Sequence, residues 1–178
     1  NFGGVGFTAI SVHKRGKSAG YVESALPWEG QNVNERLNRL ERDLATFKTL
    51  HGTSDPEYND RAANLYGGLR ETWEGLVEEI LLNKCIRRHS GEVQTLRLEK
   101  VAFSHEDYVT IARAMSKCSE WMRGHDRSKA LDVNRPSPDE IRGDIDSVRA
   151  FAKHLRNAQK QTETARHALL KPASPPRG

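Results

Sequence analysis

Features typical of secreted, membrane or metal-binding proteins are scarce in this sequence. It contains two cysteines, Cys85 and Cys118, and neither belongs to a Cys-x-x-Cys pair or to a paired-histidine zinc pattern. We interpret both as small buried hydrophobic residues in a reducing compartment, and we expect no metal site. No apolar run approaches the roughly 20 residues that span a bilayer, and no signal peptide opens the chain. These absences favour a cytoplasmic protein without membrane contact.

A strong charge of one sign is also absent from most of the chain. The net charge is +4, but seven Lys or Arg residues and a single acid, Glu163, lie from position 149 onward. The other 21 bases and 23 acids leave the preceding part with a net charge of −2. The basic excess therefore belongs to the C-terminal end and does not indicate a uniformly basic surface for nucleic acid.

The first 28 residues differ in composition from the rest. Two β-favouring segments flank a basic turn, which predicts a small β-hairpin within 1–28. Gly16, Lys17 and Ser18 match the end of a P-loop, but Ser11 stands where that motif requires a glycine. We therefore interpret these residues as a hairpin turn. Because the chain begins at Asn1 rather than at a methionine, we expect it to be a piece of a longer protein.

Apolar periodicity after position 28 predicts a mainly α fold, an approximately four-helix bundle within 29–157. The first helix should end near Gly52, and its narrow apolar seam follows steps of four and three residues: Val33, Leu37, Leu40, Leu44 and Phe47. A central helix is predicted from Asp60 to His89 and should pack antiparallel to the first. Its glycine pair at 67–68 indicates either a close neighbour or a local break.

The second half of the chain contains two helix starts with clear capping residues. Ser104 and Asp107 should begin a third helix that ends at Gly124, with an apolar stripe of Tyr108, Ile111, Ala112, Met115 and Cys118. Ser137 and Pro138 should begin the fourth, with a stripe of Ile141, Ile145, Val148, Ala152 and Leu155. Residues 93–101 could form a short strand or an extended connector. Residues 158–178 are predicted to be a basic, disordered tail.

Charged side chains lie close to the apolar stripe of the central helix. Arg70 and Glu74 are four residues apart, and Glu78 follows one turn later. The plain interpretation is an ion pair on the helix surface, worth a few tenths of a kcal/mol. The alternative is a functional site in which the arginine binds a phosphate and the carboxylate exchanges a proton.

Two further groups of polar residues are candidates for chemistry. His105 stands at the predicted start of the third helix, where the helix dipole favours the neutral imidazole of a general base. The plain interpretation is an ordinary surface histidine in the helix cap. Lys117 precedes a cluster at the end of that helix, formed by Arg123, His125 and Asp126. This cluster could hold phosphate or simply be a solvated helix terminus.

Three motifs connect the chain to a known family. They are L-Y-G-G-L-R-E-T-W-E-G-L-V-E-E-I-L-L-N at 65–83, G-E-V-Q-T-L-R-L at 91–98 and S-K-C-S-E-W-x-x-G-H-D at 116–126. This ordered series, with L-P-W-E at 26–29, resembles the C-terminal region of large bacterial ABC/SMC-type AAA ATPases, over about 26–155. Related proteins include the wobble-nucleotide-excising tRNA nucleases, anticodon nucleases of phage defence. The resemblance implies that residues 1–28 form the edge of an adjoining ATPase head.

The resemblance implies specific roles. Arg70, Glu74 and His105 match the arginine, glutamate and histidine of the nuclease pattern, with Lys117, Arg123, His125 and Asp126 as auxiliary phosphate-binding residues. ATP and Mg²⁺ belong to the parent head, because this chain has no Walker or signature motif. The Arg-x(4–6)-His motif of many helical ribonucleases is not matched, since Arg123 and His125 are too close.

Two functions remain open at this point. The first is a metal-independent ribonuclease acting on tRNA under the control of the ATPase head, with the 2′-hydroxyl as nucleophile. The second is a non-catalytic module that docks on the head or forms a homodimer through the seam at 33–47, with a tail that touches nucleic acid. The nuclease requires Arg70, Glu74 and His105 to converge on one cleft.

Overall fold

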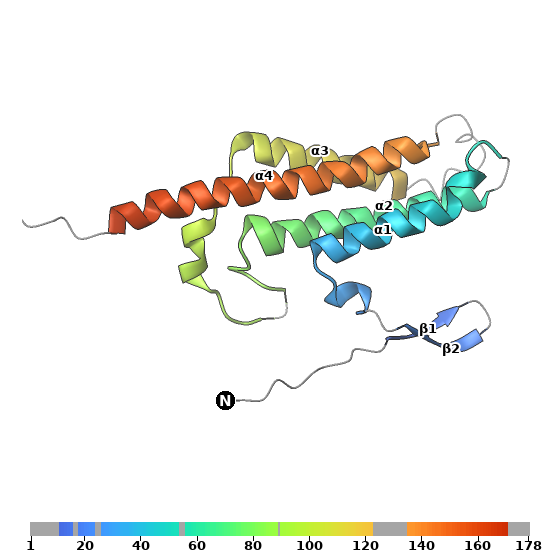
Figure 1. The fold of residues 1–178 in the computed structure, drawn as a ribbon, viewed down its shortest axis with the longest axis horizontal. Helices are drawn as coiled ribbons and strands as arrows, with labels where there is room; N and C mark the ends of the chain where they lie inside the picture. The colour runs from blue at the N-terminus through green and yellow to red at the C-terminus, as the bar shows by residue number, and fades with distance from the viewer. Residues whose placement is uncertain are drawn as a thin grey trace, which may run out of the picture.

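The chain folds mainly into helices, as its periodicity predicts. The computed structural model describes residues 11–15, 18–23, 26–53, 56–88, 90–122 and 135–170. The four principal helices are α1 (Val33–Phe47), α2 (Glu57–Leu76), α3 (His105–Met122) and α4 (Pro138–Leu170). Figure 1 shows α1 and α2 side by side in opposite directions, with α4 projecting beyond the other three toward its C-terminal end. A helical bundle is therefore confirmed.

Short elements precede and connect these helices. Strands β1 (Ser11–Arg15) and β2 (Ser18–Glu23) pair antiparallel, with Val12 opposite Val22. The 3₁₀ turns η1 (Trp28–Gly30) and η2 (Lys48–Leu50) flank α1. A π-helical turn, η3 (Val77–Leu81), continues α2, and a 3₁₀ helix, η4 (Thr95–Lys100), precedes α3.

Helix α1 presents its predicted seam to the interior. The Asn32 side chain accepts hydrogen bonds from the backbone N–H groups of Asn34 and Glu35, and the Glu35 carboxylate accepts one from the Asn32 N–H, which forms a complete capping box. All five seam residues are buried in the core of the bundle. The seam is therefore not available for the homodimer contact that the second hypothesis offered as an alternative to docking on the head.

The glycine pair of α2 marks a close approach between helices and not a break. A Cβ on Gly68 would lie 2.9 Å from Cδ2 of Leu40 and 3.3 Å from Cη2 of Trp28, whereas Gly67 faces only Met122, at 3.9 Å. Helix α2 continues without interruption through both glycines. Glycine at 68 thus allows α1 and Trp28 to pack directly on the α2 backbone.

The central helix ends earlier than predicted. It continues through η3 to Leu81, and the chain then turns, with Asn83 and Lys84 at φ values of 48° and 55°. The Lys84 N–H donates to the Glu78 carbonyl at 2.9 Å, which ends the helical hydrogen-bond pattern. The predicted helix is therefore wrong over 82–88, because apolar periodicity continues past a left-handed turn that it does not reveal. His89 lies outside the described residues.

We predicted a short strand or an extended connector at 93–101. Residues 95–100 instead form the 3₁₀ helix η4, so this prediction is wrong there. In η4 the backbone is coiled, and its carbonyl groups accept hydrogen bonds from side chains of other elements. The Asn83 amide donates to the Arg97 carbonyl at 3.0 Å, and the Arg166 guanidinium donates to the carbonyls of Leu98 and Glu99. These donors satisfy the backbone without a partner strand.

Both predicted N-terminal caps are confirmed. The Asp107 N–H donates to Ser104 Oγ at 3.1 Å while the Ser104 N–H donates to the Asp107 carboxylate at 2.9 Å. Ser137 Oγ likewise accepts from the Glu140 N–H at the start of α4. The stripe of α4 is buried as predicted, but Tyr108 of α3 is 58% exposed, so the buried face of α3 excludes it.

Helix α4 continues to Leu170, so the predicted disordered tail is wrong over 158–170. This segment is rich in helix-forming Ala, Gln, Lys and Arg, and its side chains contact elements on the bundle. Gln159 donates to the Ile80 carbonyl, and Lys100 forms an ion pair with Glu163 at 3.1 Å. Residues 171–178 lie outside the described residues.

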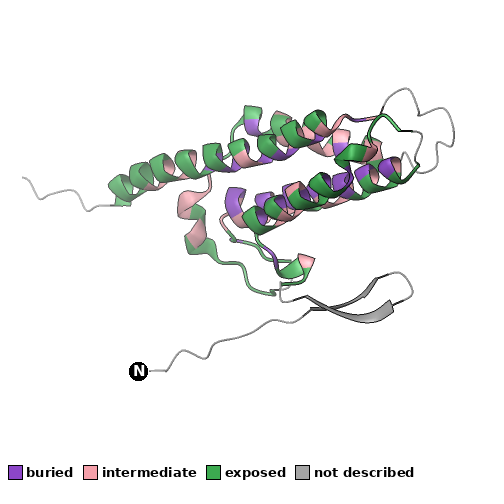
Figure 2. Ribbon diagram, turned by 45° about the vertical axis from the view of Figure 1, so that its right-hand side comes forward, coloured by how far each residue is buried: buried purple, intermediate pink, exposed green. Residues whose placement is uncertain are grey.

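One core joins all four helices. Figure 2 shows the buried residues on the inward faces of the helices. The Trp73 ring of α2 lies 5.4 Å from that of Phe151 of α4, and Tyr66 stacks on Trp121 of α3 at 5.8 Å. None of the described helices has both the length and the apolar character needed to cross a bilayer.

Candidate functional site

Arg70 and Glu74 lie side by side at the contact between α2 and α3. The Arg70 Nη1 donates to Ser119 Oγ at 2.5 Å, and its Nε is 3.4 Å from Glu74 Oε1. Ser119 in turn donates to the Met115 carbonyl at 2.8 Å. Both charged side chains are about one-third exposed. The arginine therefore joins two helices as well as two residues of one helix.

Glu74 is shared with a second arginine from the segment that follows α2. Arg88 Nη2 lies 2.9 Å from Glu74 Oε2, and Arg88 Nε lies 3.3 Å from Glu78 Oε2. The Arg88 N–H also donates to Glu78 Oε1. Two arginines and two glutamates therefore form one charge-balanced network, and the turn after η3 positions Arg88 in it. Such a network stabilises the helix contact and leaves no cation of the group without a carboxylate.

His105 lies far from this network. It is the first residue of α3, exposed to solvent, with its ring 6.5 Å from that of Tyr108. Ser119, which binds Arg70, is fourteen residues further along the same helix, and at 1.5 Å per residue this is about 21 Å. The structure therefore brings Arg70 and Glu74 together but does not bring His105 to them. The predicted convergence on one cleft is absent from the described part of the chain.

Lys117 is held by carboxylates of α4. Its Nζ lies 2.8 Å from Asp144 Oδ2 and 2.8 Å from Glu140 Oε1. Tyr66 of α2 donates to the same Asp144 carboxylate at 2.7 Å. Burial on its own would lower the pKa of Lys117, but the hydrogen bonds to Asp144 and Glu140 raise it above its usual value. Lys117 is thus a paired cation that connects α3 to α4.

Neighbouring groups of this cluster keep their protons. Burial, with the hydrogen bond to Asp144, raises the pKa of Tyr66 far above its usual range. Burial, with the nearby charge of Asp144, raises the pKa of Cys118 to about 12. Cys118 and Cys85 are both free thiols and buried, which supports our interpretation of them as small core residues. A buried thiol of raised pKa is a poor nucleophile.

The remaining predicted site residues, Arg123, His125 and Asp126, lie outside the described residues. Sequence reasoning missed Ser119 and Arg88, the partners of Arg70 and Glu74. It also missed the pair formed by buried Asp107 and His154, whose Nε2 is 3.0 Å from the carboxylate. Each pair joins residues distant in sequence, so spacing gives no signal for them.

We compared the chain with known protein families, curated proteins and solved structures. No family model, curated protein or solved structure matches the chain.

Proposed function

We propose that the chain is a non-catalytic helical docking module of an ABC/SMC-type ATPase, the family that its three motifs resemble. The position of His105, about 21 Å along α3 from the residue that binds Arg70, carries this proposal. General acid–base catalysis needs its groups within hydrogen-bond reach of the same substrate atoms. Arg70 and Lys117, the two described cations assigned to phosphate, are already paired with carboxylates.

The contacts of Trp28, in the segment that precedes α1, support the docking role. Trp28 donates through Nε1 to the Glu71 carboxylate of α2, and its ring packs beneath the guanidinium groups of Arg36 and Arg39, at 5.2 and 5.8 Å. Arg36 also donates to the Glu71 carbonyl at 3.0 Å. The segment that leads into α1 is therefore fixed to two helices at once. A displacement of the preceding chain would be transmitted to the bundle.

An exposed apolar segment supplies a surface for the ATPase head of the parent chain. Large apolar side chains that are at least half exposed concentrate within 93–108, namely Val93, Leu96, Leu98, Phe103 and Tyr108. Leu96 is 88% exposed, although it lies in a regular 3₁₀ helix. Contiguous exposed apolar surface is typical of interaction sites, and we expect the ATPase head to cover these residues. The contact with nucleic acid expected of the basic end stays a prediction.

In the parent ATPase we expect the backbone amides of 93–108 to exchange with deuterium about tenfold more slowly than in the isolated chain, because the head covers them. Replacing Leu96 and Leu98 with aspartate should abolish this protection. Ile86→Asp is the matched control, since Ile86 is 54% exposed and lies outside the segment. Equal exchange in the parent and in the isolated chain would contradict the proposal.

The isolated chain is expected to leave tRNA intact in the presence of EDTA. Arg70→Ala should lower the free energy of unfolding by about 1 kcal/mol, because it removes the contacts to Ser119 and Glu74. His105→Ala should be neutral in stability, because His105 is exposed. Gel analysis of tRNA and denaturant unfolding of the variants check both statements. Cleavage to a cyclic phosphate end that is lost in Arg70→Ala, Glu74→Ala and His105→Ala would establish the nuclease instead.

A further inference from the structure

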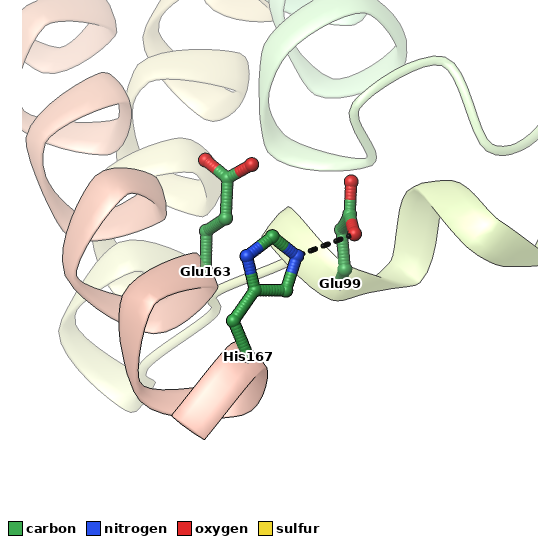
Figure 3. Close-up of side chains that lie close together, drawn as sticks. All are labelled: Glu99, Glu163 and His167. Carbon is green, nitrogen blue, oxygen red and sulfur yellow. Dashed lines mark hydrogen bonds and ion pairs between the residues drawn. The ribbon is translucent and has the colours of Figure 1, made fainter. Parts of the chain in front are cut away.

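Three side chains with metal-ligating atoms meet where the end of α4 crosses η4. Glu163 and His167 lie four residues apart on α4, and Glu99 comes from η4. Figure 3 shows the His167 ring directed toward Glu99, with Glu163 one turn earlier on the same helix. Among the described residues, this is the only group of three or more His, Cys, Asp or Glu side chains close enough to share a metal ion. From the sequence we predicted no metal site, because it contains no Cys-x-x-Cys pair and no paired-histidine pattern. Glu99 is distant in sequence from Glu163 and His167, so spacing along the chain does not reveal this cluster.

The distances suit a small divalent cation. His167 Nε2 lies 3.1 Å from Glu99 Oε2. Two ligands bound tetrahedrally to zinc at about 2.0–2.1 Å are themselves about 3.3 Å apart. One ligand atom from each of the three residues lies within 4.8 Å of the others, so closing the set requires a shift of at most about 1.5 Å. Glu163 is partly exposed on the helix surface, and its side chain can rotate that far.

One nearby cation, Lys100, is paired with a carboxylate of the cluster. Lys100 Nζ lies 3.1 Å from Glu163 Oε1, and the Arg166 guanidinium binds the carbonyls of Leu98 and Glu99. Arg166 uses backbone oxygens and leaves the Glu99 carboxylate to His167. Lys100 is therefore the competitor that a bound cation must displace, and its removal should strengthen binding.

The end of α4 would gain most from such a cation. No described residue of α4 beyond Leu155 is buried, so polar contacts to η4 and η3 hold this part of the helix. An imidazole with two carboxylates is a donor set that Zn²⁺ uses, with water completing the coordination. We propose that Glu99, Glu163 and His167 bind one zinc-class divalent cation that fixes the end of α4 to η4. This inference is independent of the docking function.

The test is calorimetric titration of the EDTA-treated, dialysed 178-residue chain with zinc chloride. Binding of one equivalent is expected, together with a rise in the thermal midpoint of unfolding. His167→Ala and Glu99→Gln should each weaken binding by more than about tenfold, because each removes a ligand. Magnesium chloride should bind at least about tenfold more weakly, because Mg²⁺ prefers an all-oxygen octahedral site.

Two further variants separate this site from general histidine binding. His154→Ala is the matched control: His154 is exposed on the same helix and pairs with Asp107, outside the Glu99, Glu163 and His167 cluster, so zinc affinity should be unchanged. Lys100→Met should tighten binding by about two- to fivefold, because it frees Glu163 of its competing ion pair. Absence of saturable binding, equal affinity in His167→Ala, or no gain in Lys100→Met would each overturn the proposal. Circular dichroism checks that every variant is folded.

Discussion

The free energy of unfolding is expected to fall steeply between pH 9 and pH 12, because several buried groups hold their protons more tightly in the folded chain than in the unfolded one. Burial raises the pKa of Cys118 from 9.0 to about 12 and that of Tyr58 from 10.0 to about 12. Burial, with the hydrogen bond to Asp144, raises the pKa of Tyr66 further. Lys117 is shifted upward by its two carboxylate partners, against the effect of burial.

The sign of the effect is the same for all four groups. A pKa that is raised on folding contributes stability that is fully present below the pKa of the unfolded chain and is lost as the pH rises toward the folded value. For Cys118 the window runs from pH 9.0 to about 12, and at ~1.4 kcal/mol per unit this amounts to about 4 kcal/mol. The tyrosines add to the loss above pH 10.0. Such a total is comparable with the whole stability of a small domain.

Denaturant unfolding at a series of pH values between 7 and 12 measures this loss. Cys118→Ala should be somewhat less stable at pH 7 but should show a shallower decline, because one of the titrating groups is gone. Tyr108→Phe is the control, since Tyr108 is 58% exposed, and its profile should follow that of the wild type. A wild-type free energy of unfolding that stays constant up to pH 11 would show that these groups do not hold their protons.

The sequence was most informative where one helix face is wholly buried. The seam of α1 and the stripe of α4 were predicted residue by residue, because a buried face repeats with the period of the helix. Caps were equally clear, since the cap residues and the backbone groups they bind are neighbours in sequence. Tyr108 fits the same period and is nevertheless exposed, because α3 forms an outer face of the bundle.

The candidate site could be predicted only as residue types. Which part of α3 faces Arg70 depends on how α3 lies along α2, and helical periodicity does not determine this position. The structure places Ser119 opposite Arg70, and His105 lies about 21 Å from Ser119 along α3. Whether Lys117 is a free cation depends on Asp144 and Glu140, which come from another helix. Spacing along the chain contains neither fact.

The ends of the elements were missed for a different reason. Apolar residues continue past Leu81, so periodicity alone extends the central helix, whereas Asn83 and Lys84 adopt left-handed backbone angles that reverse the chain. At the other end of the sequence, polar composition suggested disorder beyond 157. There, contacts from Gln159 and Glu163 to η3 and η4 supply what an apolar stripe would otherwise provide.

Trp73→Ala is expected to lower the free energy of unfolding by about 3–5 kcal/mol, because it leaves a cavity where α2 packs on α4. Trp73 is 2% exposed, and its ring lies 5.4 Å from that of Phe151. Arg70, three residues earlier on α2, is partly exposed at the contact with α3, so its loss should cost only about 1 kcal/mol. The buried apolar face of the central helix therefore contributes more to stability than its partly exposed charges do.

Denaturant unfolding of the two variants at pH 7 compares these contributions directly. Leu96→Ala serves as the control, because Leu96 is 88% exposed and its truncation should change stability by no more than about 0.5 kcal/mol. If Arg70→Ala proved more damaging than Trp73→Ala, the polar network would be the main support of α2.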